Sequence, residues 1–156
     1  MTMSTQPAPG EPSTAEIMIG AIATMLEGLG HVAVGARSPI PGSAAHLARA
    51  RSDGRLRVSI LGSRTHSSFT DGARELFDCA GQGRIDAFFL SGGQIDGQAN
   101  INLVGVGDIA EHPRAKARFP GSFGSAYLYY VVPRVILFAL EHTPRTLVPK
   151  VDFVSA

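Results

Sequence analysis

The sequence predicts an α/β fold: an open, mostly parallel sheet with flanking helices and a mixed C-terminal part. Between residues 13 and 90, helical and strand-like segments alternate, which is the order that builds parallel β-α-β units. After residue 125, aromatic and β-branched runs are separated by turn residues, which is typical of successive strands. Hydrophobic residues make up 44% of the 156 residues, enough for one domain with a sizeable core.

The first ninety residues supply the helices and strands of the parallel part. A helix is expected to begin after Ser13 or Thr14, either of which can cap it, with Glu16 in its first turn and apolar residues at helical spacing up to Leu29. Further helices are expected over residues 43–51 and 71–82, and strands over residues 31–35, 56–61 and 85–90. The C-terminal strands are expected over residues 126–132, 135–140 and 146–154.

The two ends of the chain differ in character. Residues 1–12 are rich in Thr, Ser, Pro and Gly without an apolar period, so we expect a flexible tail, followed by one domain over residues 13–156. Residues 150–154 look like an interior strand, yet the sequence stops at Ala156 without a polar tail. We therefore expect the domain to be truncated at its C-terminus or completed by a partner chain.

Composition excludes several functional classes. A formal net charge of +1 gives no field that would favour nucleic acid or an anionic membrane, and no apolar stretch reaches the roughly 20 residues that span a bilayer. The single cysteine, Cys79, is expected in the core, and the N-terminus lacks a secretion signal, so a cytoplasmic protein is expected. Four of the five histidines, His31, His46, His112 and His142, show no metal-ligand spacing, so no metal site is expected at them.

Two glycine-rich segments follow the expected strand over residues 85–90. The first supplies a backbone that a ligand can approach and side chains that donate and accept hydrogen bonds: Gly92, Gly93, Gln94, Asp96, Asn100 and Asn102. The second can aim N–H groups at a phosphate or an oxyanion: Gly121, Ser122, Phe123, Gly124 and Ser125. Neither has the spacing of an ATP or dinucleotide motif. The alternative is that these glycines form turns and the amides satisfy buried backbone.

Four segments carry a resemblance to a known family: FLSGGQIDGQANIN, GVGD, KARFPGSFGSA and PKVDFVSA. They resemble the β subunit of the family I CoA-transferases, most of all the glutaconate CoA-transferase type. The resemblance covers roughly residues 15–156 and is strongest from Phe89 onward. It implies a CoA-transferase-like fold, acyl-CoA as substrate with no permanently bound cofactor, a carboxylic acid as acceptor, and a similarly folded α subunit in an α2β2 heterotetramer. In that family the glycine loops hold the oxyanion and part of the CoA.

The sequence departs from the family at the nucleophile. The family's catalytic glutamate attacks the thioester from a position that Leu61 occupies here, and leucine has no nucleophile. Replacements within this chain are His66, as a general base on water in the loop after the strand, and the acidic Glu75 and Asp71, which are more typical of a solvated helix face or, for Glu75, of pairing with Arg74 or Arg84. Where the family resemblance gives a glycine, this chain has Arg37, which either contacts a substrate carboxylate or a CoA phosphate or is solvated at the surface.

The second glycine loop also departs from the family pattern. Phe123 and Ser125 replace glycines, which narrows the expected pocket and adds an apolar wall. The resemblance therefore leaves three hypotheses open. The chain is a β subunit for CoA transfer, or one for hydrolysis or ring opening with a carboxylate from the partner, as in steroid-ring-cleaving CoA hydrolases, or a non-catalytic scaffold subunit. A domain like the sugar-phosphate isomerases lacks support, because no paired Asp and Lys is present to transfer protons.

Overall fold

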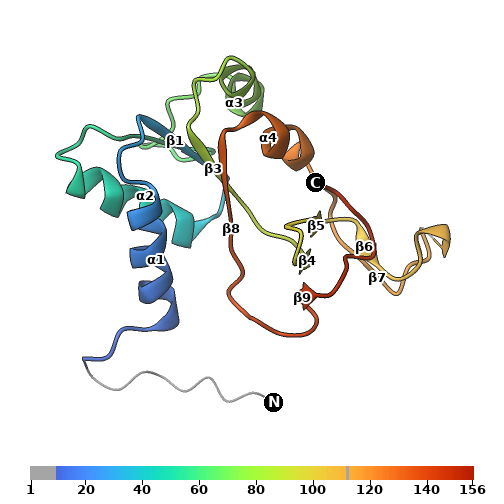
Figure 1. Cartoon of the computed structure of the whole chain (residues 1–156). Coiled ribbons are helices and arrows are strands. Elements are labelled where there is room, and N and C mark those ends of the chain that lie inside the picture. Colours follow the sequence, from blue (N-terminus) through green and yellow to red (C-terminus); the bar gives the residue numbers. More distant parts are fainter. Residues whose placement is uncertain (1–9, 112) are drawn as a thin grey trace.

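A parallel four-stranded sheet flanked by helices forms the centre of the protein (Figure 1). The computed structural model describes residues 10–111 and 113–156. The helices are α1 (Thr14–Met25), α2 (Pro39–Arg51), α3 (Gly72–Gly81) and α4 (Ser125–Val131), with a 3-10 turn at Ile109–Glu111. The strands are β1 (His31–Val34), β2 (Arg57–Ile60), β3 (Ala87–Leu90), β4 (Gln94–Asp96), β5 (Ile101–Asn102), β6 (Gly105–Val106), β7 (Ala117–Arg118), β8 (Arg134–Leu137) and β9 (Leu147–Val148).

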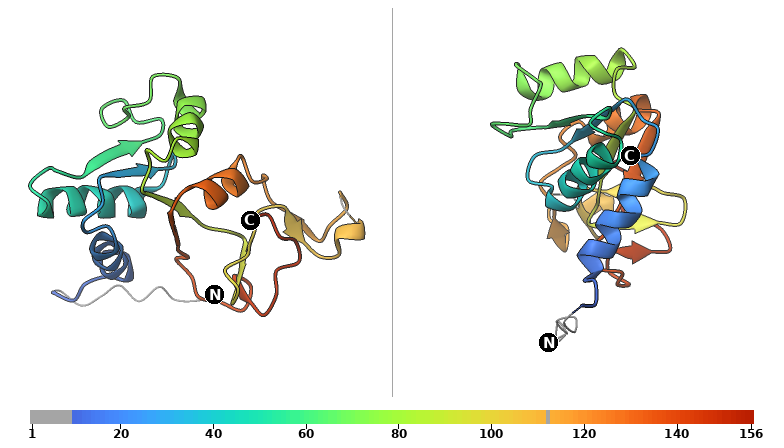
Figure 2. Two further views of the ribbon diagram at one scale, coloured as in Figure 1. Left: turned by 45° about the horizontal axis from the view of Figure 1, so that its top comes forward. Right: turned by 90° about the vertical axis from the view of Figure 1, so that its left-hand side faces the viewer.

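The sheet has the order β2-β1-β3-β8, and its two faces carry separate apolar cores. Helices α1 and α2 cover one face, and α3 and α4 cover the other (Figure 2). Strand residues alternate between the cores, so Val32 and Val34 pack under α1 and α2 while Ala33 faces α3. The four strands pair in parallel, which confirms the predicted α/β class with a parallel sheet. Helices on both faces bury both sides of each strand, which explains the nearly continuous apolar sequence of the strands.

The segment after β3 leaves the large sheet and builds smaller ones. Strand β4 pairs antiparallel with β5 and parallel with β9, and β6 pairs antiparallel with β7. These short strands lie beyond the end of β3 in Figure 1. The C-terminal part is therefore mixed, as the sequence predicted.

Helix α4 corrects the expectation of a strand over residues 126–132. Its aromatic and β-branched residues favour strands, but Leu128 and Val132 are four positions apart and are both buried, which is helical spacing. Pro133 then ends the helix, since the residue before a proline prefers an extended backbone, and Val132 has φ −81° and ψ 127°.

The expected strand over residues 146–154 is also largely wrong. Only Leu147–Val148 pairs in a ladder, because Pro149 interrupts the run without a backbone N–H to donate. The last residues still join the small sheet, where Ser155 donates to the Ile101 carbonyl and Ile101 donates to Ala156.

The N-terminal helix begins where the sequence predicted. Ser13 accepts a hydrogen bond from the Glu16 N–H at 3.2 Å, and the Glu16 carboxylate accepts one from the Ser13 N–H at 2.8 Å, so both residues form a capping box. Most of the predicted tail, residues 1–9, lies outside the described residues. Within the described ranges, no helix combines the length and apolar character needed to cross a membrane.

Candidate functional site

Gly92 and Gly93 are packed against the protein's own atoms. A β-carbon on Gly93 would lie 2.2 Å from two ring carbons of Phe119, and one on Gly92 would lie 2.8 Å from the carbonyl oxygen of Gln94. Both distances are shorter than any normal contact, so only glycine fits at these positions. The close approach that the sequence predicted for a ligand is made in this chain by the Phe119 ring.

Gln94 and Asn102 form a buried hydrogen-bond network with the C-terminal segment. The Asn102 amide donates to Gln94 Oε1 and to the Gly105 carbonyl, each at 2.7 Å, and its oxygen accepts from the N–H groups of Val104 and Gly105. Gln94 in turn donates to the Asp152 carboxylate at 3.0 Å. These contacts fix residues 103–105 and residue 152 around one buried amide pair.

Asp96 and Asn100 form a second network at the tip of the same segment. One carboxylate oxygen of Asp96 accepts from the N–H groups of Gln98 and Asn100, and both oxygens accept from the Asn100 amide. The other oxygen also accepts from the Val151 N–H. The Asn100 amide, with these backbone donors, holds the pKa of Asp96 below its ordinary value.

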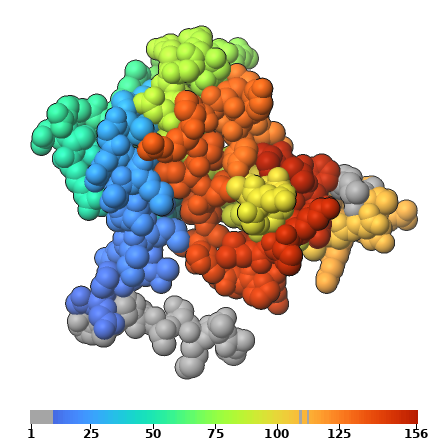
Figure 3. Space-filling model, in the orientation of Figure 1, coloured from blue at the N-terminus to red at the C-terminus, as the bar shows by residue number. Residues whose placement is uncertain are grey.

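The first glycine segment is therefore a hairpin tied to the end of the chain. Figure 3 shows its yellow tip between the orange and red C-terminal segments. Within the described part of the chain, no buried side-chain nitrogen or oxygen lacks a hydrogen-bond partner. The polar side chains that the sequence proposed for a ligand form their hydrogen bonds within the protein. This agrees with the alternative that the sequence left open, in which the amides satisfy buried backbone groups.

The second glycine segment presents free backbone donors. Gly121 (φ 101°) and Gly124 (φ 88°) have left-handed backbone, and Phe123 (φ 47°) shares it while its side chain is 81% exposed. Among the described residues, none accepts a hydrogen bond from the N–H of Phe123 or Gly124. Ser125, by contrast, donates both its N–H and its hydroxyl to the Ser122 carbonyl.

Leu61 lies at the end of β2, beside the end of β1. Its N–H donates to the Val34 carbonyl at 2.9 Å, and its side chain packs against the core under α3 and α4. The preceding residue, Ile60, faces the other side of the sheet. There a cavity of about 680 Å³ opens between the start of α2 and the loop after β2, lined by Arg37, Ser38, Pro39, Gly42, Ser43, His46, Ile60 and His66. The structure thus brings Arg37 and His66 together, and it adds His46.

His46 is a cavity residue that the sequence analysis did not select. Its ring meets the His66 ring edge to face, with the ring centres 4.5 Å apart. Burial, the charge of His66 and the charge of Arg49 together lower the pKa of His46. No sequence spacing links these residues, because one lies on a helix and the other on a loop twenty residues later.

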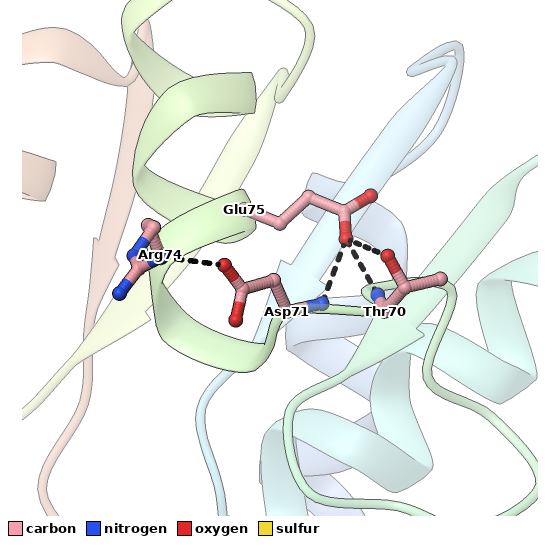
Figure 4. A network of polar contacts seen from close by, with 4 residues as sticks. All are labelled: Thr70, Asp71, Arg74 and Glu75. Carbon is pink, nitrogen blue, oxygen red and sulfur yellow. Dashed lines mark hydrogen bonds and ion pairs between the residues drawn. The ribbon is translucent and has the colours of Figure 1, made fainter.

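The acidic residues near the cavity are occupied elsewhere (Figure 4). Glu75 accepts hydrogen bonds from the N–H and hydroxyl of Thr70 and from the Asp71 N–H, and the Asp71 bond is the main cause of its lowered pKa. Asp71 pairs with Arg74 at 3.1 Å, so Arg74, one of the partners that the sequence left open for Glu75, pairs with Asp71 instead. Glu75 caps the start of α3 and does not line the cavity.

Two further expectations concern single residues. Cys79 is buried in the core under α3 and α4, as predicted for a packing thiol. In residues 10–111 and 113–156, no group of three or more His, Cys, Asp or Glu side chains could hold a metal ion. His112 lies outside the described residues.

Comparison with solved structures gives the same fold. The decarboxylase AibA/AibB matches with 25% identity and a TM-score of 0.79 over 93% of this chain and 66% of that chain. IpdAB from Rhodococcus jostii RHA1 matches at 23% identity and TM-score 0.76, over 93% of this chain and 61% of that one. Glutaconate coenzyme A-transferase from Acidaminococcus fermentans matches at 18% identity and a TM-score of 0.72, over 93% of this chain and 62% of that chain. The chain thus spans about two thirds or less of these relatives.

The family follows from a comparison with family models. No curated protein matches the chain. The model described as coenzyme A transferase matches residues 16–156, which is nearly the whole domain. The chain belongs to the coenzyme A transferase family.

Proposed function

We propose that this chain is the β-type subunit of an α/β enzyme that acts on an acyl-CoA thioester, with the attacking group supplied by the α-type partner. The observation that carries the proposal is Leu61, a hydrocarbon side chain at the end of β2 where the family resemblance places a glutamate; the residue before it, Ile60, lines an open cavity with Arg37. Leucine cannot attack a carbonyl carbon, so covalent catalysis from this position is excluded.

The reaction then needs a carboxylate or an activated water from outside this position. The attacking oxygen adds to the thioester carbonyl, the C–S bond breaks, and CoA leaves as a thiol after taking up a proton. Arg37 is suited to bind a carboxylate or phosphate of the substrate, and the unpaired N–H groups of Phe123 and Gly124 are suited to an oxyanion. The Arg37 cavity includes no residue of either glycine segment, and the proposal assigns the completion of the site to the α-type partner.

The similar proteins support a two-subunit enzyme, but they do not all catalyse the same type of reaction. AibA/AibB is named as a decarboxylase and IpdAB as a pair of chains, while the third is a transferase. Transfer, hydrolysis or ring opening, and decarboxylation of an acyl-CoA are therefore the reactions to test. Loss of the glutamate favours the reactions that need no acceptor acid.

The experiment uses the chain co-expressed with an α-type subunit. Acyl-CoA is supplied with and without an acceptor acid, while CoA thiol and CO2 are measured. We expect turnover without an acceptor.

Arg37→Ala should raise KM about tenfold or more, since a hydrogen bond to a charged group contributes about 1.5–3 kcal/mol. His66→Gln lowers kcat only where His66 takes the proton from water. Arg145→Ala, exposed and outside the cavity, is the control. Strict dependence on an acceptor, with glutamyl-CoA trapped on this chain, contradicts the proposal.

The second candidate is a non-catalytic scaffold subunit. It is favoured by the internal use of the Gln94, Asp96, Asn100 and Asn102 side chains, which leaves the first glycine segment structural. Calorimetric titration with CoA separates the two functions. Heat of binding that Arg37→Ala removes supports the enzyme, and absence of heat with and without the partner supports the scaffold.

A further inference from the structure

A second cavity, which we call the arginine pocket, lies at the free edge of β2. It has a volume of about 410 Å³ between α2 and the loop after β2, and its polar lining residues are His46, Arg49, Arg57, Thr65, His66, Ser67 and Ser68. Strand β2 is the outermost strand of the large sheet, so this edge has no neighbouring strand in that sheet. The pocket shares His46 and His66 with the Arg37 cavity and extends that cavity along α2.

The arginine pocket carries positive charge without a matching acid. No Asp or Glu lines it, and within the described residues neither Arg49 nor Arg57 forms an ion pair. Residues 37–64 hold six arginines and a single aspartate, Asp53. Burial and then Arg57 lower the pKa of His31, and burial, His66 and Arg49 lower the pKa of His46, so the charges near the pocket act in the same direction as burial.

A chain of hydrogen bonds through the buried Ser59 hydroxyl ends at the wall of the arginine pocket. Ser68 Oγ lies 2.5 Å from Ser59 Oγ, which lies 2.8 Å from Nε2 of His31, and Nδ1 of His31 lies 3.0 Å from the Arg84 carbonyl. A carbonyl only accepts, so Nδ1 carries a proton, and in neutral His31 the Nε2 atom accepts from Ser59. Protonation of His31 reverses the chain and leaves the Ser68 hydroxyl free to donate into the pocket.

We propose that the arginine pocket binds a phosphate group of a small molecule. Two guanidinium groups without carboxylate partners supply the positive charge and the N–H donors that a phosphate takes up in bidentate hydrogen bonds. Ser67, Ser68 and the two histidines add donors around the same volume. The phosphate comes from a free anion such as pyrophosphate or from the phosphorylated nucleotide end of CoA, and both offer the same chemistry to the pocket.

Calorimetric titration of the full chain with pyrophosphate and with adenosine 3′,5′-bisphosphate tests the proposal. Arg49→Gln and Arg57→Gln should each weaken binding about tenfold, and the double variant about a hundredfold. The control is Arg51→Gln, an exposed arginine two positions along α2 that does not line the pocket. Tighter binding of the nucleotide identifies CoA as the source, and equal binding identifies a free anion. Neither probe contains a thioester, so this result is independent of the proposed reaction.

The pH dependence provides a second readout. Sulfate keeps its two charges between pH 5.5 and 8, and its affinity should rise as the pH falls, because protonated His31 and His46 add donors and charge. Arg57 and Arg84 oppose protonation of His31, and Asp86 favours it. His31→Gln should reduce the pH dependence. The proposal is overturned by absence of heat with every probe, by unchanged binding in the double variant, or by equal weakening in Arg51→Gln.

Discussion

Replacing Asn102 with alanine tests whether the first glycine segment is held together by its amides. Asn102 is fully buried, and its removal leaves the buried N–H and carbonyl of Gly105, and the half-buried N–H of Val104, without their side-chain partner. Gln94 Oε1 keeps its bond from the Asp152 N–H at 2.9 Å, so it does not add to the loss. An unpaired buried polar group costs about 1–3 kcal/mol. Two such groups predict a loss of about 2–6 kcal/mol, at the lower end where water enters the space.

The assay is urea unfolding of the purified chain, followed by circular dichroism. The matched control is Gln98→Ala, an exposed residue of the same segment, which should change the unfolding free energy by less than about 0.5 kcal/mol. A loss below about 1 kcal/mol for Asn102→Ala, equal to the control, would refute the structural role. That result would favour the other hypothesis, in which the buried amides bind a ligand.

Asn102→Asp serves if the alanine variant fails to fold. It keeps the acceptor for the Gly105 N–H but loses both donors, and it faces a carboxylate toward the Gln94 oxygen and the Gly105 carbonyl. The folded pKa of this carboxyl is then raised, so its destabilisation is present above that pKa and shrinks as the pH falls through it. A variant equally destabilised at pH 7 and pH 4 would contradict the contacts described.

Two further predictions concern the same segment. Gly93→Ala should destabilise by about 1–3 kcal/mol, since the new β-carbon would lie 2.2 Å from the Phe119 ring, and Phe119→Ala in the same chain should recover part of the loss in thermal unfolding. Asp96, whose pKa is lowered, stabilises the fold above its unfolded pKa of about 3.9, and this contribution is lost as the pH falls through the lower folded value. Asp96→Asn should remove that acid dependence from the melting curve, and an unchanged pH profile would show that Asp96 does not contribute it.

The sequence predicted the parallel half well because its signals are local. The apolar spacing of residues 14–29 and the Ser13 and Glu16 pair specify α1, and the continuous apolar run before residue 91 specifies β3. Helix α4 was missed because its Tyr and Val residues favour strands when taken one at a time. The burial of Leu128 and Val132 against α3 and β3 decides the outcome, and that contact is absent from the local sequence.

The candidate site was less predictable because its contacts are distant in sequence. Nothing near Gly93 shows that Phe119, 26 positions later, fills the space above it. The pairing of His46 with His66 likewise depends on α2 and the loop after β2 lying side by side. Motif resemblance finds residue types that a family uses, but the partner of each polar atom appears only in the folded chain.

Charge is the clearest case in which a total conceals a local feature. The formal charge of +1 predicts no field, yet six of the 14 basic residues fall within residues 37–64 while twelve of the 13 acidic residues lie elsewhere. Folding places Arg49 and Arg57 at one cavity at the edge of β2. It adds His46 from α2 and His66 from the loop after β2 to the same cavity. Like charges that stay unpaired at short range are unfavourable unless an anion joins them. The distribution of charge, and not its sum, therefore directs the search for a ligand to this edge of the sheet.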